Sequence, residues 1–417
     1  MIAGKTIRLS KILDPSDGRG VVVAADHGFM LGSIQGVENL EKTLSRVVEG
    51  KPDAILVSPG QAARLNYLFH GRDAPALLVR TDWTNAFRDK TYTLPARTVH
   101  RRAVAAAKDA VSLGASGIVT YYFMGHSSDE REAENFRLMA CFARECDRVG
   151  MPFIVEPLPM GERVTGANFA DLAIAAVRIA AEAGADAIKA VYTGDIETFS
   201  RVVKAAGVPV LILGGAKAKT LRDALEIVDE ALEAGAAGVV YGRQVLQAPD
   251  PAQFVRSVRA VVHEGWTILQ VLNPVTGPVR LQVYPERCTR CRVCELVCTS
   301  THGQGFSPQA ARLRVEFLGP DSYKPVTCIL CGQCVEACPT GALSFQPQLR
   351  YVQLHPEKCN GCRDCVQACP VDVVRFDEQT GLPIICDMCG GAPNCALWCQ
   401  PEAIITEKQT ERGNDAA

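Results

Sequence analysis

The sequence predicts an α/β protein, a (β/α)8 TIM barrel followed by a smaller α+β domain. Two observations predict it. Eight short apolar runs alternate with helix-like segments over residues 21–265, and 16 of the 18 cysteines fall between Cys288 and Cys399. So sharp a break in composition indicates two domains. We expect the barrel over 1–268, a linker over 269–282, the cysteine-rich domain over 283–407 and a polar tail over 408–417.

Each predicted strand is nearly all apolar, as a strand buried on both faces of a parallel sheet should be. The segments between the strands are rich in Ala, Leu, Glu and Arg, and several end in a glycine. Eight such units match a TIM barrel. An open doubly wound sheet is the alternative, but it normally has fewer strands and a GxGxxG fingerprint after the first, which is missing here. The predicted strands are 21–28, 54–60, 76–82, 117–122, 152–158, 187–193, 208–215 and 238–243.

Charge and hydropathy narrow the class of protein. The formal net charge is −2, and no long run of one sign occurs, so we expect no nucleic-acid partner. The first residues lack the apolar core of a secretion signal, and no run approaches the ~18 apolar residues of a membrane helix. The chain is therefore predicted to be cytoplasmic and to have no membrane contact.

The cysteines form four groups of four. The first three groups have the spacing C-x2-C-x2-C-x3-C, and the fourth widens its middle gap to five residues. Three closely spaced thiolates wrap one corner of an iron–sulfur cubane, and the fourth cysteine ligates the other cluster of a pair. Zinc is the alternative, but it usually takes two separated pairs. We predict four [4Fe–4S] clusters and no nucleotide or flavin. The ligands are Cys288, Cys291, Cys294, Cys298, Cys328, Cys331, Cys334, Cys338, Cys359, Cys362, Cys365, Cys369, Cys386, Cys389, Cys395 and Cys399.

The cysteine-rich domain resembles the four-cluster iron–sulfur subunits of molybdenum and tungsten oxidoreductases, above all the electron-transfer subunit of aldehyde ferredoxin oxidoreductases. The resemblance lies in CTRCRVCELVC, HGQGFSPQAARLRVEF, CGQCVEACPTGALSF and CNGCRDCVQACPVDVVRFD. It implies a polyferredoxin that serves a separate aldehyde-oxidising tungsten or molybdenum subunit, with a ferredoxin as a further partner. It also implies that group one pairs with group four and group two with group three. The implied sets are Cys288, Cys291, Cys294 and Cys399; Cys386, Cys389, Cys395 and Cys298; Cys328, Cys331, Cys334 and Cys369; and Cys359, Cys362, Cys365 and Cys338.

A lysine on the sixth predicted strand is the leading catalytic candidate. Catalytic groups of TIM barrels lie at the carboxyl ends of the strands, where Asp26, Glu156 and Lys189 fall. Lys189 interrupts an apolar strand, which is costly unless the lysine is paired or functional. Burial lowers the pKa of a lysine, and a neutral amine can form a Schiff base with a carbonyl. A structural lysine paired with a carboxylate such as Asp26 is the alternative, and Asp26 could equally be a salt-bridge partner at the barrel rim.

Glycines and one arginine after the last two strands favour a phosphate site. Backbone N–H groups exposed by glycine, together with an arginine, can cradle an anion. We assign this role to Gly214, Gly215, Gly242 and Arg243, with His27 as a further substrate hydrogen bonder. His126 is predicted to be a solvated loop residue. Arg80 and Trp83 follow the third strand, and the sequence assigns neither a role.

The barrel resembles the archaeal-type class I fructose-bisphosphate aldolase family, a DeoC-like group that includes aminodideoxy-heptulosonate synthases. The resemblance spans residues 3–265 and lies in GKTIRLSKILDPSDGRGVVVAADHGFMLG, GADAIKAVYTGD, GVPVLILGGAK and GAAGVVYGRQVLQAPDPAQF. It implies that Lys189 is the Schiff-base lysine, Asp26 a catalytic carboxylate, and Gly215, Gly242 and Arg243 ligands of the substrate phosphate. A phosphorylated or deoxy ketose as substrate and a homo-oligomer formed through the barrel follow from it.

The fifth strand departs from the family pattern. Family members carry W-S-Y-P-R-G or M-M-Y-P-R-G there, and the tyrosine handles a proton. This chain has Glu-Pro-Leu-Pro-Met-Gly from Glu156, so Leu158 stands where the tyrosine is expected. Leucine cannot transfer a proton. We hypothesise that Glu156 substitutes for it, with Tyr121 or Tyr122 as the alternative donor.

The sequence thus predicts a Schiff-base aldolase fused to an electron-transfer polyferredoxin. Two other functions remain open at this point. The barrel could be a non-catalytic docking domain of an electron-transfer subunit, as the missing tyrosine would allow. The clusters could instead be structural parts of a plain aldolase.

Overall fold

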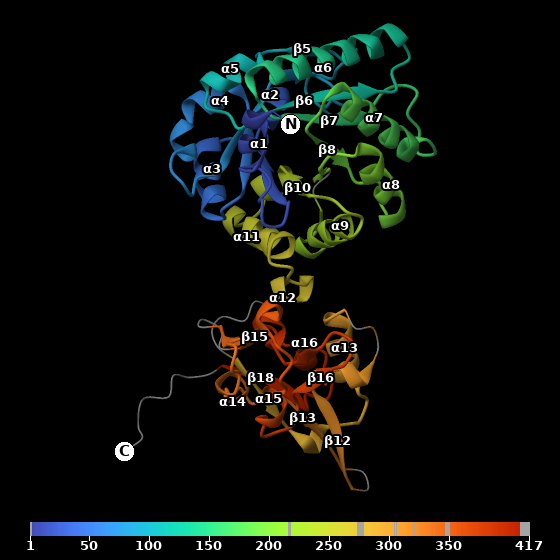
Figure 1. Cartoon of the computed structure of the whole chain (residues 1–417). Coiled ribbons are helices and arrows are strands. Elements are labelled where there is room, and N and C mark those ends of the chain that lie inside the picture. The colour runs from blue at the N-terminus through green and yellow to red at the C-terminus, as the bar shows by residue number, and fades with distance from the viewer. Residues whose placement is uncertain are drawn as a thin grey trace. The chain divides into compact units, whose positions relative to one another are not determined.

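The computed structural model divides the chain into two compact units, Met1–Ile268 and Leu269–Ala417, which are described separately. The structure describes residues 2–215, 218–272, 279–303, 305, 307–319, 322–346 and 351–408. Figure 1 shows the first unit as a ring of helices around a barrel of strands, and the second as short strands and short helices.

Eight parallel strands of the first unit close into a barrel in the order β1-β10-β9-β8-β7-β6-β3-β2. All eight predicted strands are in it, so the predicted TIM barrel is confirmed. Nearly every strand position is buried, because inward side chains fill the barrel and outward ones face the helices. The strands are β1 Gly20–Ala24, β2 Ala54–Val57, β3 Ala76–Arg80, β6 Gly117–Met124, β7 Phe153–Pro159, β8 Ala187–Val191, β9 Val210–Leu213 and β10 Gly238–Tyr241.

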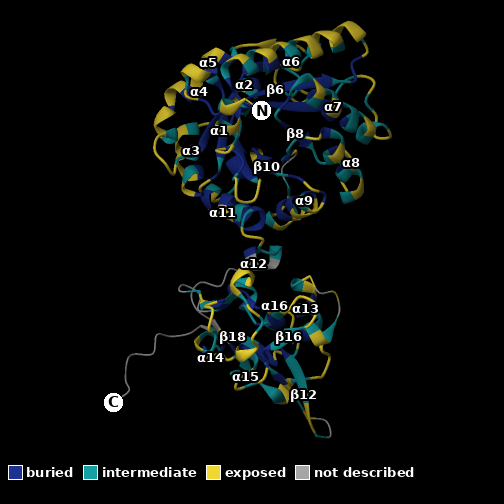
Figure 2. Ribbon diagram, viewed as in Figure 1, coloured by how far each residue is buried: buried dark blue, intermediate teal, exposed yellow. Residues whose placement is uncertain are grey.

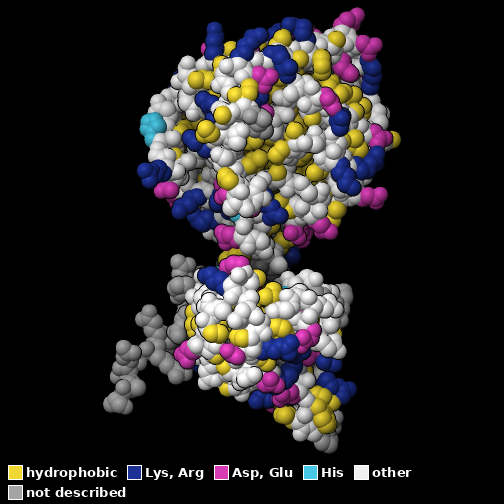
Figure 3. All heavy atoms as spheres, viewed as in Figure 1, with side chains coloured by type: hydrophobic (Ala, Val, Ile, Leu, Met, Phe, Trp, Pro, Cys, Tyr) yellow, Lys and Arg dark blue, Asp and Glu magenta, His cyan; other side chains and the backbone are white. Residues whose placement is uncertain are grey.

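The helices of the first unit bury one face against the barrel and leave the other exposed, as Figure 2 shows. Figure 3 shows Lys, Arg, Asp and Glu side chains spread over the visible surface of this unit. Local signals fix their ends. Thr220 and Asp223 form a capping box at the start of α9, and Gly184 ends α7 in the left-handed conformation. The helices are α1 Ala3–Leu9, α2 His27–Leu31, α3 Leu40–Glu49, α4 Pro59–Arg64, η1 Asn66–Phe69, α5 Ala107–Ser112, α6 Asp129–Val149, α7 Phe169–Ala183, α8 Ile196–Ala206, α9 Leu221–Glu233, α10 Arg243–Leu246 and α11 Pro251–Val262.

The barrel interior changes from apolar to charged along the strands. Leu78, Ile154 and Ala187 belong to the apolar core cluster. Side chains of a strand alternate between its two faces, so the next inward residue lies two positions further on. On β3, β7 and β8 these next residues are Arg80, Glu156 and Lys189. The register of the strands therefore aims all three into the carboxyl end of the barrel.

A two-stranded antiparallel ribbon, β4 Asp82–Thr84 and β5 Arg101–Ala103, is inserted between β3 and β6. The segment between its strands and the helix α2 contribute to an apolar cluster at the barrel mouth. Its buried members are Met30, Tyr121, Phe123 and Leu158, with Trp83 and Phe87 among those packed against them.

The second unit consists of antiparallel strand pairs and short helices, which agrees with the predicted α+β domain. The strand pairs are β11 Val279–Val283 with β18 Ile404–Lys408, β12 Arg314–Gly319 with β13 Ser322–Val326, β14 Leu343–Phe345 with β15 Val352–Leu354, and β16 Arg375–Asp377 with β17 Leu382–Ile384. The helices are α12 Ile268–Leu272, η2 Pro285–Arg287, α13 Val293–Thr301, η3 Pro308–Ala310, α14 Gln333–Glu336, η4 Pro356–Lys358, α15 Asp364–Gln367, η5 Met388–Gly391 and α16 Asn394–Leu397.

Two predicted boundary segments are described in part. The predicted linker 269–282 holds most of α12 and most of β11, while 273–278 lie outside the described residues. The predicted tail lies outside them from 409 onward. Among the described helices, none has the length and apolar character that a membrane span requires.

Candidate active site and iron–sulfur region

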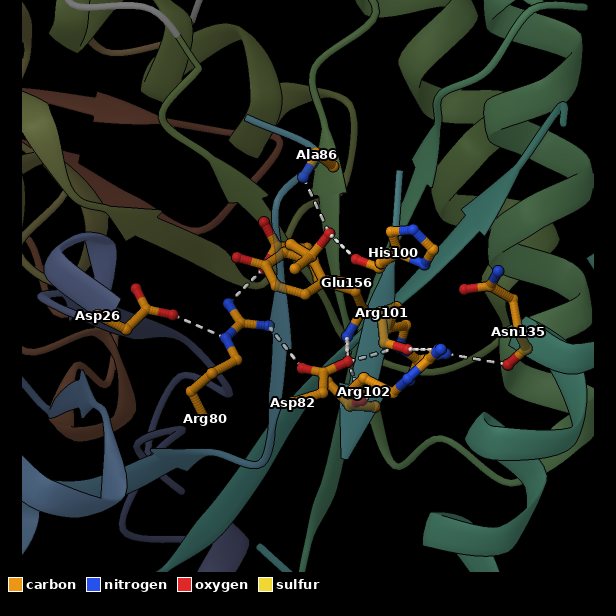
Figure 4. Close-up of polar contacts among 12 residues, drawn as sticks. Asp26, Arg80, Asp82, Ala86, His100, Arg101, Arg102, Asn135 and Glu156 are labelled. Atoms are coloured by element: carbon orange, nitrogen blue, oxygen red, sulfur yellow. Dashed lines mark hydrogen bonds and ion pairs between the residues drawn. The ribbon is translucent and has the colours of Figure 1, made fainter. Parts of the chain in front are cut away.

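Four charged side chains meet at the carboxyl end of the barrel. Arg80 donates from Nε to Asp26 Oδ2 at 2.7 Å and from Nη2 to Glu156 Oε2 at 2.6 Å (Figure 4). The Nζ of Lys189 lies 2.9 Å from the same Glu156 oxygen. Two carboxylates and two cations therefore alternate in one continuous row: Asp26, Arg80, Glu156, Lys189.

The row is closed off from solvent. Arg80 is 0% exposed, Asp26 3%, Glu156 5% and Lys189 7%. Buried ions are tolerated when oppositely charged groups satisfy them, and here two charges of each sign do so. Burial is the largest single influence and would raise the pKa of Asp26, but the charge and hydrogen bond of Arg80, together with His27 and Lys189, outweigh it and lower that pKa. Asp26 is therefore ionised at neutral pH.

The partner of Lys189 is Glu156, where the sequence left pairing with Asp26 open. The 2.9 Å contact is within the hydrogen-bond reach that proton transfer requires. Leu158, two residues further along β7, is buried in the apolar cluster at the mouth. The structure thus brings the predicted lysine and the predicted glutamate together.

Asp26 and His27 do not lie on a strand, contrary to the prediction. The strand β1 ends at Ala24, and the backbone then turns into α2, with the N–H of Phe29 donating to the carbonyl of Asp26. His27 is the first residue of that helix. This turn directs Asp26 toward Arg80 instead of continuing the sheet.

The predicted phosphate residues lie together at the ends of the adjacent strands β9 and β10. Arg243 donates from Nη2 to the carbonyl of Gly215 at 2.7 Å, which links the loops after these strands. A Cβ built on Gly242 would stand 2.2 Å from Cε1 of His27, so a side chain at that position would force the imidazole to move. Gly215 ends the described part of its loop, since 216–217 lie outside the described residues.

Arg80 is the central residue that the sequence reasoning left without a role. Its guanidinium carbon lies 3.9 Å from the ring centre of Tyr121, a cation–π contact. Tyr121, one of the two alternative proton donors, is therefore beside the charged row. Burial raises the pKa of the other one, Tyr122, to about 12. A signal for Arg80 existed, because it is a cation in an apolar strand just as Lys189 is.

In the second unit, thiols from different sequence groups lie close to one another. Burial is the main cause of the raised pKa of Cys294, and the nearby Cys291 and Cys399 add to it. For Cys334 the added causes are Cys331 and Cys369. These neighbours bring the last cysteine of one group to the first three of another.

The other two predicted ligand sets also combine cysteines from two sequence groups. Burial again comes first, and Cys389 and Cys298 further raise the pKa of Cys395. Cys362 and Cys338 are among the causes that raise the pKa of Cys365. Several thiolates crowded in this way repel one another unless cations hold them, as the iron of a cluster does.

The backbone of the second unit also fits cluster binding. The N–H groups of Arg312 and Leu330 donate to the sulfurs of Cys298 and Cys328 at 3.3 and 3.4 Å. Arg290 and Arg363, which lie between ligand cysteines, adopt left-handed φ angles of 59° and 68°. Such turns curl the chain around a central group. The residues present therefore suit iron–sulfur clusters.

A parallel barrel with a buried lysine–carboxylate site, followed by cysteine sets of this kind, defines an aldolase-type enzyme fused to ferredoxin-like domains. The chain belongs to the DeoC/LacD family of aldolases, whose model matches residues 20–248. Two models described as 4Fe-4S dicluster domains match 287–343 and 327–373. The predicted family of the barrel and the predicted iron–sulfur character of the second unit are confirmed.

Individual relatives agree with this assignment. An uncharacterized aldolase of Saccharolobus solfataricus is 35% identical, over 65% of this chain and 98% of its own. The 2-amino-3,7-dideoxy-D-threo-hept-6-ulosonate synthase of Halobacterium salinarum is also 35% identical, over 63% of this chain and 92% of its own. A solved archaeal fructose-1,6-bisphosphate aldolase, its catalytic lysine covalently bound to a carbinolamine intermediate, matches with a TM-score of 0.54 and 30% identity, over 62% of this chain and 99% of its own.

Proposed function

We propose that the barrel is a Schiff-base aldolase acting on a phosphorylated or deoxy ketose. The observation that carries this proposal is the 2.9 Å contact between Lys189 Nζ and the Glu156 carboxylate. This contact lies inside a barrel that belongs to an aldolase family. The covalent lysine intermediate of the solved archaeal relative supports the same chemistry. The departure at Leu158 makes a substrate other than fructose 1,6-bisphosphate the better expectation.

The proposed steps use three side chains. Glu156 takes a proton from the Lys189 ammonium, and the free amine attacks the ketone carbonyl to give a carbinolamine. Glu156 returns the proton as water leaves, which gives a protonated imine. The ionised Asp26 takes the proton of the β-hydroxyl, the carbon–carbon bond breaks, and an aldehyde departs. Asp26 then returns its proton to the enamine carbon, which restores a protonated imine, and water releases the ketone and restores Lys189.

Arg80 and the phosphate residues position these groups in the proposal. The two hydrogen bonds of Arg80 hold Asp26 and Glu156 on either side of it. The substrate phosphate is assigned to the loops after β9 and β10, with Gly215, Gly242, Arg243 and His27 around it. The strand β9 pairs directly with β8, which carries Lys189, and β10 is the next strand beyond β9.

We further propose that the second unit holds four [4Fe–4S] clusters and transfers electrons. Contacts between thiols of different sets support a single row. Cys294 contributes to the raised pKa of Cys395, Cys328 to that of Cys386, and Cys334 to that of Cys365. In each case burial is the larger cause. When bound, such clusters carry one electron at a time.

The electron partner in this proposal is a separate tungsten or molybdenum aldehyde oxidoreductase, with a ferredoxin at the other end of the row. The chemistry supports the link, since an aldolase releases an aldehyde that such an enzyme oxidises. Anaerobic purification from the native source tests it. We expect a tungsten- or molybdenum-containing subunit to co-purify, and about 16 iron atoms per chain, four for each of four clusters.

Borohydride trapping tests the aldolase. The chain is incubated with ketose phosphates, reduced with borohydride and examined by peptide mass spectrometry. We expect an adduct on Lys189 that Lys189→Met abolishes and that the exposed Lys204→Met control retains. If no ketose phosphate gives an adduct on Lys189, the barrel is a docking domain and the chain an electron-transfer subunit.

A further inference from the structure

A second cavity, of about 290 Å³, lies between β5 and the start of α6. Its lining includes His100, Arg101, Arg102, His126, Arg131 and Asn135, but not Asp26, Glu156 or Lys189. Figure 4 shows His100, Arg101, Arg102 and Asn135 together on the right, across β-strands from Asp26 on the left. Its volume is near the lower end of ligand sites, roughly 300 Å³, so the occupant is a small molecule.

Arg101 separates this cavity from the active site. All three of its guanidinium nitrogens are held: Nε by Asp82 at 2.6 Å, Nη2 by Thr120 at 2.6 Å, and Nη1 by the carbonyl of Asn135 at 3.0 Å. Asp82 in turn lies 3.9 Å from Arg80. A side chain fixed at three points is a rigid wall, so the cavity is distinct from the lysine site.

The charges around the cavity favour an anion. Three arginines and two glutamates line it. The carboxylate of Glu134 is already held by both ends of Arg137 at 2.8 Å, and Arg101 by Asp82. The remaining charged residues of the lining are Arg102, Arg131 and Glu130, so two positive charges stand against one negative charge. Anions are drawn to such a site, and arginine binds carboxylates and phosphates through two hydrogen bonds.

Two polar groups in the wall favour a ligand that also carries hydroxyls. The carboxamide of Asn135 is oriented by its Nδ2, which donates to the carbonyl of Arg131 at 2.9 Å. Its oxygen is buried and has no hydrogen-bond partner within the described part of the chain. Such an acceptor calls for a donor. His126, predicted to be solvated, is instead 2% exposed, and burial lowers its pKa, so its ring is a neutral hydrogen bonder.

We propose that this cavity binds a small hydroxylated anion, of the hydroxycarboxylate or sugar-phosphate class, at a site separate from Lys189. Arg102 and Arg131 hold its negative group. Asn135 and His126 bond its hydroxyls. The apolar side chains of Val99, Phe123 and Leu138 close the remaining wall.

Calorimetric titration of the full, cluster-loaded chain with D-glycerate tests this proposal. We expect saturable binding to one site, at least tenfold weaker in the Arg102→Gln, Arg131→Gln double variant. Both replaced side chains are exposed, so the fold should persist. The matched control is Arg178→Gln on α7, an exposed arginine outside the cavity lining, which should stay within twofold. Acetate, which lacks hydroxyls, and glycerol, which lacks charge, should each bind at least tenfold more weakly than D-glycerate.

The Lys189→Met variant separates this proposal from the proposed function. It should bind D-glycerate as the unmodified chain does, whether or not the barrel is an aldolase. The proposal is overturned if D-glycerate shows no saturable binding up to about 10 mM. A dissociation constant of about 10 mM corresponds to a binding free energy of roughly −2.7 kcal/mol. Unchanged affinity in the double variant also overturns the proposal, as does binding that is lost in Lys189→Met, since the ligand would then occupy the lysine site.

Discussion

Glu156 stands between the two cations of the charged row and contacts both through a single oxygen. A carboxylate so placed stabilises the Lys189 ammonium, yet it is also the nearest base that can remove that proton. This placement supports the proposal that Glu156 transfers the proton in this barrel, where Leu158 stands at the position expected for the family tyrosine. If Glu156 carries the proton, its negative charge is essential for that step, whereas its size and shape are not.

Replacement of Glu156 by glutamine isolates that charge. Glutamine keeps the size and a hydrogen-bonding oxygen but cannot accept a proton, so we expect kcat to fall about 10²- to 10⁴-fold. Turnover of the trapped ketose is the measurement, and Glu182→Gln on the exposed face of α7 is the control. Unchanged turnover would assign the proton to another group, and Tyr121→Phe would then be the variant to measure.

We expect Arg80 to stabilise the fold in addition to its proposed positioning role. Its removal would leave Asp26 and Glu156 buried without their shared cation. We expect Arg80→Met to lower the free energy of unfolding by about 3–5 kcal/mol, the range for breaking one partner out of a buried ion pair. Urea denaturation measures it, with exposed Arg178→Met as a control of little effect. A loss of less than about 1 kcal/mol, as for an exposed pair, would show that water reaches the row.

At the scale of elements, the backbone after β10 determines how closely α2 approaches the residues proposed to bind phosphate. Gly242 lets His27 lie directly against the backbone between β10 and α10. Any side chain at that position would meet the imidazole and the carbonyl of Ala24, which is 3.0 Å from the Cβ position. The contact ties the start of α2, and with it Asp26, to the proposed phosphate site.

Gly242→Ala should therefore displace His27. We expect KM for the phosphorylated substrate to rise at least tenfold with a smaller change in kcat, and the overpacked side chain to cost about 1–3 kcal/mol of stability. Steady-state kinetics and urea denaturation measure the two effects. Gly60→Ala is the control, because a Cβ at Gly60 meets nothing within 4 Å. An unchanged KM would place the phosphate elsewhere.

For the molecule as a whole, the two units differ in what holds them together. The barrel has a large apolar core. In the second unit, cysteines are prominent among the core residues: Cys294, Cys298 and Cys395 in one cluster, Cys334 and Cys365 in another. We expect short strands and short helices with such a core to depend on bound clusters, because metal-binding free energy becomes folding free energy.

Removal of iron should accordingly unfold the second unit and spare the barrel. We expect chelation under oxidising conditions to abolish the visible absorbance of the clusters and part of the circular dichroism. The barrel transition should shift by less than about 2 °C, the effect of about 1 kcal/mol in a domain of this size. Calorimetry of the loaded and iron-free chain measures it. A barrel transition lowered by more than about 5 °C would mean that the units stabilise each other.

Part of the fold and of the candidate site could be predicted from the sequence alone. The eight strands follow from apolar runs bounded by helix signals, and the 16 predicted ligands follow from cysteine spacing, because both patterns are local. Lys189 was identifiable for the same reason, as a cation within an apolar strand.

The tertiary structure decided which side chains meet. Arg80, Glu156 and Lys189 come from strands far apart in the sequence, and they become neighbours because the barrel closes with their inward positions at one level. That closure made Glu156 the partner of Lys189, gave Arg80 its central place and buried His126 beside a second cavity. Local patterns cannot encode these contacts, since each depends on the register between strands that the closed sheet fixes.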